Sequence, residues 1–180
     1  AAVVLVVRQP GVLPEPDAFA QLQQMGVTVE RPQVVMTADD GMRLVLENAA
    51  RLERRSEGEV ALRTETGEQR PLATERKLKV EVPNGRQFRL VLDDGSEVWL
   101  NAGSTLSYRS DFNRSSRDIG LSGEAYFEVA RNADLPFRVQ ARGCTFTVLG
   151  TRFNISAYDE DPDVLAALME GSLQFESSRS

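Results

Sequence analysis

Gly150 and Thr151 are neighbouring residues whose types could carry out a covalent reaction. A threonine hydroxyl can attack the carbonyl of the preceding residue, and hydrolysis of the resulting ester would cleave the chain. A glycine before the threonine leaves that carbonyl accessible and permits a strained backbone. The same glycine is also typical of a bend between two strands, here between the runs 145–149 and 152–157. The sequence leaves both interpretations open, self-cleavage and a strand bend.

Acidic residues occur in pairs that could bind a cation or act as acid and base. Asp39-Asp40 and Asp93-Asp94 each stand directly before a glycine and between alternating apolar runs. Aspartate accepts local backbone hydrogen bonds in turns, and Asp-Gly between such runs is a strong hairpin signal. We therefore predict that both pairs form hairpin turns rather than catalytic sites.

Glu124 and Glu128 form a further acidic pair. Both lie on an expected strand with Tyr126, and the two-residue period of a strand places all three side chains on one face. Two carboxylates on one face are the groups that a glycosidase uses. Nothing in the sequence marks either glutamate as buried, so this role stays an alternative.

Composition excludes several classes of site. The 180 residues include no histidine and one cysteine, Cys144, so the commonest general base is missing and no internal disulfide can form. The net charge of -6 argues against a nucleic-acid partner, because phosphate binding needs a basic face. We therefore expect no metal, no cofactor and no enzyme activity other than self-cleavage at Gly150-Thr151.

Period-two alternation of apolar residues from Leu78 to Ala157 predicts an all-β fold. The turn residues between the runs favour antiparallel hairpins stacked as a sandwich or a short solenoid. Trp99, the single tryptophan, points away from the face of its neighbours on the strand. Either a second layer covers that face or the ring is a contact residue, and we expect the covered arrangement. The predicted core consists of large apolar members of the runs: Leu92, Val98, Leu100, Phe127, Val139, Val148 and Phe153.

Other segments are expected to differ from this pattern. One short helix is predicted over Ala18 to Met25, with Asp17 as its N-cap. The run Ala1 to Val7 is too short to cross a bilayer, which takes about 20 residues. Its β-branched residues favour an opening strand over the end of a membrane helix. The arginine-containing stretch Arg109 to Arg117 is expected to be a solvated loop.

The polar segment Thr64 to Arg76 is the expected seam of the chain. It divides the sequence into N-terminal strands with a lead-in hairpin (1–77), a regular β core (78–176) and a frayed end (177–180).

Five stretches carry most of the regular pattern. In order they are LVLDDGSEVWLNAGSTLSY (Leu90 to Tyr108), LSGEAYFEVA (Leu121 to Ala130), PFRVQA (Pro136 to Ala141), VLGTRFNISAY (Val148 to Tyr158) and LMEGSLQF (Leu168 to Phe175). In sequence, order and spacing these stretches resemble the core of the FecR-type family of periplasmic sigma-factor regulators.

The resemblance implies the periplasmic sensor core of an anti-sigma factor anchored in the inner membrane by a single span. A cytoplasmic segment, absent from these 180 residues, would bind an extracytoplasmic-function sigma factor. The periplasmic part would contact the signalling domain of a TonB-dependent outer-membrane transducer. Some members of the family cleave themselves at a Gly-Thr bond in this VLGTRF block, which the resemblance carries over to Gly150 and Thr151.

A second class of function is a carbohydrate- or ligand-binding β-sandwich. Such a domain would need exposed aromatic residues clustered with acids. Only 7% of the residues are aromatic, and most are phenylalanines at alternating core positions. The sequence therefore favours a module that binds a protein partner.

Overall fold

The structure, a computed structural model, describes residues 3–5, 32–54, 60–73 and 75–177. Within these ranges the chain is all-β, as predicted, and has no helix, hence none that could span a membrane. The helix predicted over Ala18 to Met25 lies outside the described residues. The strands are β1 (Val3–Leu5), β2 (Val34–Ala38), β3 (Arg43–Leu46), β4 (Ala49–Arg54), β5 (Val60–Thr64), β6 (Gln69–Leu72), β7 (Lys77–Glu81), β8 (Phe88–Val91), β9 (Glu97–Leu100), β10 (Thr105–Arg109), β11 (Arg117–Glu128), β12 (Phe137–Ala141), β13 (Cys144–Val148), β14 (Arg152–Ala157), β15 (Val164–Glu170) and β16 (Leu173–Ser177).

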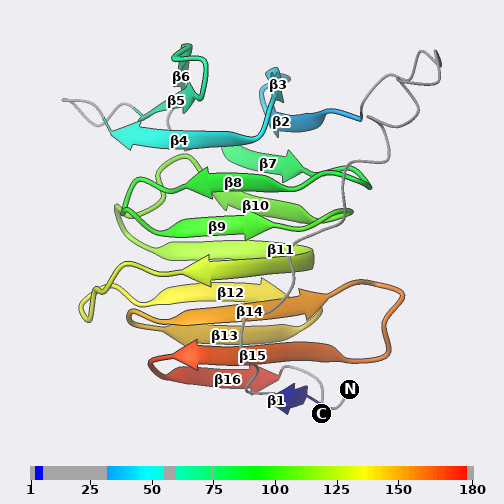
Figure 1. Ribbon diagram of the computed structural model, residues 1–180. Helices are drawn as coiled ribbons and strands as arrows, with labels where there is room; N and C mark the ends of the chain where they lie inside the picture. The colour runs from blue at the N-terminus through cyan, green and yellow to red at the C-terminus, as the bar shows by residue number, and fades with distance from the viewer. Residues whose placement is uncertain (1–2, 6–31, 55–59, 74, 178–180) are drawn as a thin grey trace, which may run out of the picture.

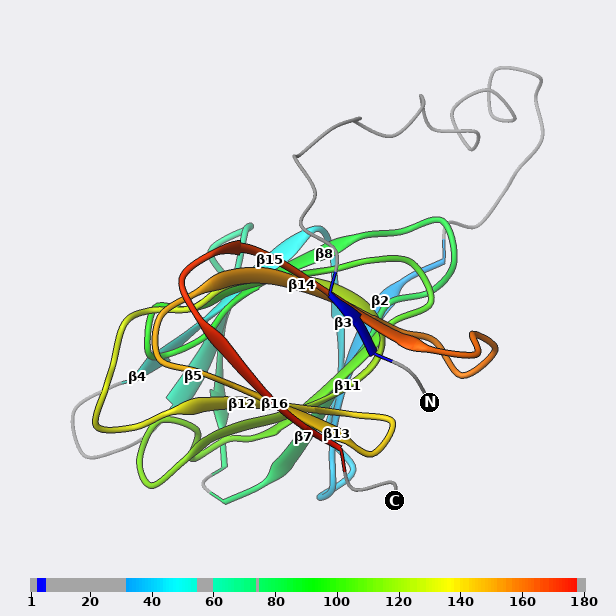
Figure 2. The same cartoon turned by 90° about the horizontal axis from the view of Figure 1, so that it is seen from below.

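The strands form two facing sheets that share β11. Sheet A has the order β1-β15-β14-β11-β9-β8-β4-β5-β6, and sheet B has the order β16-β13-β12-β11-β10-β7-β2-β3. Figure 1 shows the strands stacked from β3 and β6 at one end to β1 and β16 at the other. Seen along the stack in Figure 2, β8, β14 and β15 lie in one wall and β7, β12 and β13 in the opposite wall. This arrangement confirms the prediction of a sandwich or solenoid-like stack.

The long strand β11 passes from one sheet to the other. Residues 117–122 pair with β10 and β12 in sheet B, whereas residues 123–128 pair with β9 and β14 in sheet A. The corner lies at Gly123, whose φ is +90° and where a Cβ would come 2.6 Å from Ser104 Oγ. The backbone N–H of Glu124 donates to that same hydroxyl oxygen at 2.8 Å. Only glycine fits this corner, because both the backbone conformation and the space exclude a side chain.

The core fills the space between the two walls. Burial alternates without a break along β11, with every second residue facing the interior in both sheets. All seven residues predicted for the core are at most 2% exposed, which confirms that prediction. The aromatic centre of the core is Phe127, whose ring stacks on Phe153 with centroids 4.9 Å apart.

Both Asp-Asp-Gly segments form the predicted hairpin turns. In the turn between β2 and β3, Gly41 N donates to Ala38 O at 3.1 Å, and in that between β8 and β9, Gly95 N donates to Leu92 O at 3.0 Å. The second aspartate of each pair accepts a hydrogen bond from the backbone N–H two residues later. Both pairs therefore stand in hairpin turns, as predicted.

Strands that precede the predicted boundary at residue 77 pair with strands that follow it. β2 pairs with β7 in sheet B, and β4 pairs with β8 in sheet A. The run at the N-terminus contains the expected strand, β1, which pairs in parallel with β15.

Candidate functional site

The peptide bond between Gly150 and Thr151 lies in the short link between β13 and β14. Thr151 is buried, and its Oγ1 donates a hydrogen bond to Ser172 O at 2.9 Å. The carbonyl oxygen of Thr151 accepts from Val129 N at 3.0 Å, and that of Leu149 accepts from Asn132 N at 2.7 Å. The backbone on both sides of the peptide bond is therefore held by the segment that follows β11.

Close backbone contacts explain why glycine stands at position 150. A Cβ there would lie 2.8 Å from Arg131 Cα, a backbone atom that cannot move aside easily. On the other side, a Cβ on Gly171 would lie 2.9 Å from Thr151 Oγ1 and 3.0 Å from Gly150 O. The hydroxyl of Thr151 and the carbonyl oxygen of Gly150 therefore both face Gly171. These contacts are those of the strand-bend interpretation, in which two glycines leave room for the link.

Carboxylates surround this link at the surface. A depression of about 310 Å³ is lined by Gly150 and Thr151 together with Glu128, Arg152 and Glu170. Arg152 Nη1 donates to Glu170 Oε2 at 2.8 Å, and Arg152 Nε lies 3.8 Å from Glu128 Oε2. Because the chain has no histidine, these carboxylates are the side chains in the depression that could accept a proton from Thr151.

A buried arginine holds the segment that covers the Gly150-Thr151 link. Arg117 is fully buried, and it donates to the carbonyl oxygens of Ala130, Asn132 and Leu135 at 2.9, 3.2 and 2.7 Å. It also donates to Asp94 Oδ2 at 2.9 Å. This single side chain therefore ties the segment 130–135 to the hairpin turn between β8 and β9.

The structure corrects the expectation that Arg109 to Arg117 is a solvated loop. Arg109 ends β10, Arg117 begins β11, and the Arg117 side chain has no exposed surface. Sequence reasoning missed the Arg117–Asp94 pair because it took charged residues to be exposed. The sequence did contain a signal, because Arg117 stands two residues before Ile119 and four before Leu121. A strand places all three side chains on one face, and both Ile119 and Leu121 are buried.

Trp99 and Tyr126 form an aromatic pair on the outer face of sheet A. They lie directly opposite each other on β9 and β11, with ring centroids 5.4 Å apart and planes tilted by 49°. The Arg89 guanidinium lies over the indole, 5.5 Å from its centroid. Trp99 is only half-buried, and no strand of the described residues forms a second layer over it, which favours the contact-residue alternative over the covered one.

The two glutamates predicted to share a face with Tyr126 do so, but neighbouring side chains engage both of them. Glu124 accepts hydrogen bonds from Asn101 Nδ2 at 3.2 Å and Asn154 Nδ2 at 2.9 Å. Tyr126 Oη donates to Glu128 Oε1 at 3.1 Å. Partial burial, followed by this hydrogen bond, raises the pKa of Tyr126. The structure therefore gives these carboxylates structural partners rather than the arrangement of an acid and a nucleophile.

Among the residues that the structure describes, no group of three or more His, Cys, Asp or Glu residues is placed to hold a metal ion. Cys144 is buried and unbridged.

Comparison with known proteins points to one family. The family model described as FecR protein matches residues 78–174. Two crystal structures of a candidate anti-sigma factor from Parabacteroides distasonis ATCC 8503, at 2.50 and 1.65 Å resolution, are 33% identical in sequence to the chain and superpose on it with TM-scores of 0.55 and 0.54. The matches cover 58% and 57% of this chain, and the chain spans about half the length of that protein, 49% and 48%. No curated protein gave a significant match.

Proposed function

The chain belongs to the FecR protein family, whose model matches more than half of its residues, and from this premise we propose that it is the periplasmic sensor and relay part of a transmembrane anti-sigma factor. The anti-sigma factor role is the one given to the crystal structures that the chain resembles. In this proposal, an extracytoplasmic-function sigma factor is bound by a cytoplasmic segment outside these 180 residues. The signal comes from the signalling domain of a TonB-dependent outer-membrane transducer.

The edge of strand β16 supports a protein partner. Strand β16 pairs with β13, and no second neighbour pairs with it among the described residues. Phe175 on this strand is 38% exposed, beside the ring of Phe146. An edge strand with an exposed aromatic residue can accept an added strand from a partner, with backbone hydrogen bonds supplying affinity and the side chain supplying specificity.

Calorimetry between the complete periplasmic region and the cognate signalling domain tests this proposal. Phe175→Lys should weaken binding at least about tenfold, because it replaces the exposed ring with a charge. Val45→Lys is the matched control, since Val45 is similarly exposed at 46% but lies on β3 at the opposite end of the stack. Absence of binding by the unsubstituted region would contradict the relay function. Equal binding by all three proteins would contradict only the involvement of β16.

A second function that we propose is slow self-cleavage at Gly150-Thr151, a bond that shares its surface depression with the carboxylates of Glu128 and Glu170. Thr151 Oγ1 would attack the carbonyl carbon of Gly150, and its proton would pass to water or to a carboxylate of the depression. The amide nitrogen of Thr151 would take up a proton and leave as an amine, and water would then hydrolyse the ester. The reaction should be slow, because the hydroxyl first has to leave Ser172 O and no imidazole is available.

Intact mass spectrometry of the complete periplasmic region after long incubation tests the cleavage. Fragments ending at Gly150 and beginning at Thr151 are expected, and they should disappear in Thr151→Ala but persist in Thr151→Ser, which keeps a hydroxyl. A full-length mass throughout, or the same fragments in Thr151→Ala, would contradict self-cleavage.

A further inference from the structure

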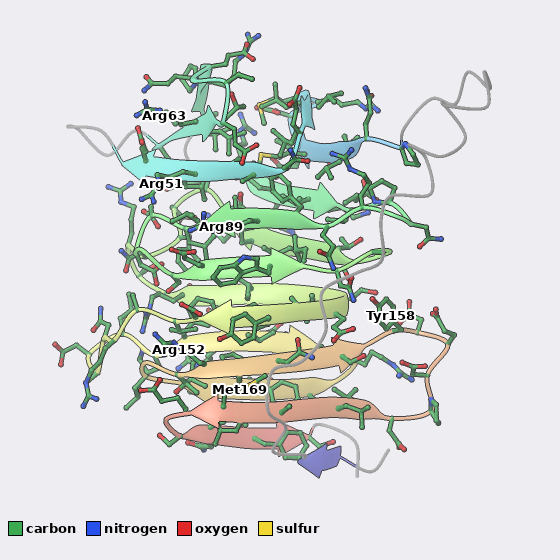
Figure 3. The ribbon with its side chains drawn as sticks, viewed as in Figure 1. Arg51, Arg63, Arg89, Arg152, Tyr158 and Met169 are labelled. Atoms are coloured by element: carbon green, nitrogen blue, oxygen red, sulfur yellow. The ribbon has the colours of Figure 1, made fainter. Side chains whose placement is uncertain are left out.

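A row of polar and aromatic side chains crosses the outer face of sheet A. Arg89 lies opposite Trp99, Trp99 opposite Tyr126, and Tyr126 opposite Asn154, on the neighbouring strands β8, β9, β11 and β14. Three strand spacings of about 4.8 Å make this row about 14 Å long. Figure 3 shows Arg89 and Arg152 on either side of β11 on this face of the molecule.

The row lies in a depression of about 400 Å³ that combines two rings with amides. Asn48, Gln87, Asn101, Asn154 and Glu124 line it beside the Trp99–Tyr126 pair. Small-molecule sites have this character, with aromatic surface for contact and a few placed polar groups for orientation. The depression plays no part in the contact at β16 or in the chemistry at Thr151 proposed above.

The polar groups are held in place by one another. Gln87 Nε2 donates to Asn101 Oδ1 at 3.2 Å, while Asn101 and Asn154 both donate to Glu124. Each bond to Glu124 uses one of the two N–H groups of a side-chain amide, and an amide also carries an acceptor oxygen. The network therefore fixes the amides while leaving each a donor that can face a ligand.

Charge at the site disfavours an anionic ligand. Arg89 is already paired with Glu97, with Nε donating to Oε2 at 2.8 Å, and the Glu124 carboxylate accepts from two neutral amides and keeps its negative charge. A neutral ligand rich in hydroxyls, each able to donate and to accept, matches the fixed amides. Arg89 lies over the indole, so the C–H groups of such a ligand would meet the parts of the two rings that line the depression.

The surroundings of the two rings favour a sugar over a protein as the occupant. The exposed large apolar residues, Val45, Leu149, Leu165, Met169 and Phe175, are all absent from the lining of this depression. Tryptophan, tyrosine and arginine also occur at the centre of protein interfaces, but there they are packed in an apolar core, whereas here the two rings are surrounded by amides. We therefore propose that the Trp99–Tyr126 face binds a neutral oligosaccharide, with the open parts of the rings against sugar C–H groups and the amides bound to hydroxyls.

Trp99 makes this proposal directly measurable, because it is the only tryptophan in the chain. The complete periplasmic region is titrated with the neutral hexasaccharides maltohexaose, cellohexaose and chitohexaose while tryptophan fluorescence is recorded. We expect a saturable change with at least one of these sugars, confirmed by calorimetry. Tyr126→Ala and Asn154→Ala should each weaken binding about tenfold or more. Polygalacturonate, an acidic polysaccharide, should bind more weakly than the best neutral sugar.

Leu165→Ala is the control, because it removes an exposed apolar side chain outside the depression and should leave sugar binding unchanged. Circular dichroism of each variant checks that it is folded. No saturable response to any of the three neutral sugars, or equal affinity in Tyr126→Ala and the unsubstituted protein, would overturn the proposal. A loss of transducer binding in Tyr126→Ala without any sugar response would assign this face to a protein instead.

Discussion

Arg117 Nη1 and Asp94 Oδ2 form a 2.9 Å ion pair that is almost completely shielded from water, with side-chain exposures of 0% and 5%. The two residues are 23 positions apart in the chain and come from the start of β11 and the hairpin before β9. Asp94 also accepts hydrogen bonds from the backbone N–H and the hydroxyl of Ser96. The pair thus links the start of β11 to the hairpin turn, and Arg117 also binds the backbone of the segment 130–135.

Replacing Arg117 with methionine should destabilise the protein by roughly 3–5 kcal/mol, because it leaves the Asp94 carboxylate buried without its cation. Urea denaturation followed by circular dichroism measures the loss. Adding Asp94→Asn to Arg117→Met should cost less than the sum of the two single substitutions, because the double variant buries no unpaired charge.

Arg138→Met provides the matched control for Arg117→Met. Arg138 pairs with Asp118 at 3.4 Å, but both side chains are more than 40% exposed. Its loss should cost less than about 1 kcal/mol. A loss of stability in Arg117→Met as small as that in Arg138→Met would show that the buried pair does not stabilise the fold.

Phe127→Ala should cost roughly 3–5 kcal/mol, because it removes a fully buried ring and leaves a cavity between the sheets. The ring stacks on Phe153 and lies edge-on to Phe137 at 6.2 Å, so neighbouring rings cannot easily fill the space. The free energy of unfolding in urea is the measurement. A loss below about 1 kcal/mol would exclude Phe127 from the core.

Tyr108 should make the protein sensitive to alkali. Burial, followed by the charge of Asp93, raises the pKa of its phenol far above the ordinary value of 10.0. The folded protein keeps this phenol neutral, whereas the unfolded chain ionises near pH 10. Its contribution to stability is therefore complete below about pH 10 and falls as the pH rises further.

Tyr108→Phe should consequently raise the pH of alkaline unfolding, followed by circular dichroism. At neutral pH it should be neutral or mildly stabilising, since no described residue forms a hydrogen bond with the Tyr108 hydroxyl. Tyr126→Phe should shift the alkaline transition less, because Tyr126 is only partly buried and its hydroxyl is bonded to Glu128. An unchanged alkaline transition in Tyr108→Phe would contradict the role of burial.

Gly150→Ala should destabilise the protein by roughly 1–3 kcal/mol, because its Cβ would collide with the backbone of Arg131. In the control Gly120→Ala, the added Cβ would meet only Ser107 Oγ at 2.5 Å, the end of a side chain that can rotate away. Thermal unfolding of both variants shows whether a clash with backbone lowers stability more than a clash with a side chain that can rotate away. Equal stability of Gly150→Ala and the unsubstituted protein would remove the packing reason for this glycine.

Local pattern was sufficient for some features of the fold. Alternation places a side chain on one face or the other, which is why Phe127 and Val139 could be assigned to the core and Asp94 to a turn. The same pattern carries no information about which strands pair. The parallel pairing of β11 with β12 depends on contacts between segments distant in sequence, as does that of β4 with β8.

The candidate sites show the same limit. Gly150 could be identified as a bend, but its contact with Arg131 depends on the segment that Arg117 holds. Trp99 was assigned to the correct face, yet whether that face is covered depends on neighbours that alternation does not specify. Arg117 was misjudged because its charge normally favours water, and the carbonyl groups that compensate for burial come from residues 13 to 18 positions further along the chain.

The corner at Gly123 also has a mechanical consequence. Among the described strands, β11 alone takes part in both sheets, so peptide bonds run without interruption from one wall into the other. Hydrogen bonds along the edge of a sheet can peel apart one after another, whereas a covalent chain bears tension as a whole. Tension along β11 itself therefore passes from one wall into the other through its backbone, with Gly123 as the point where the direction of the force turns.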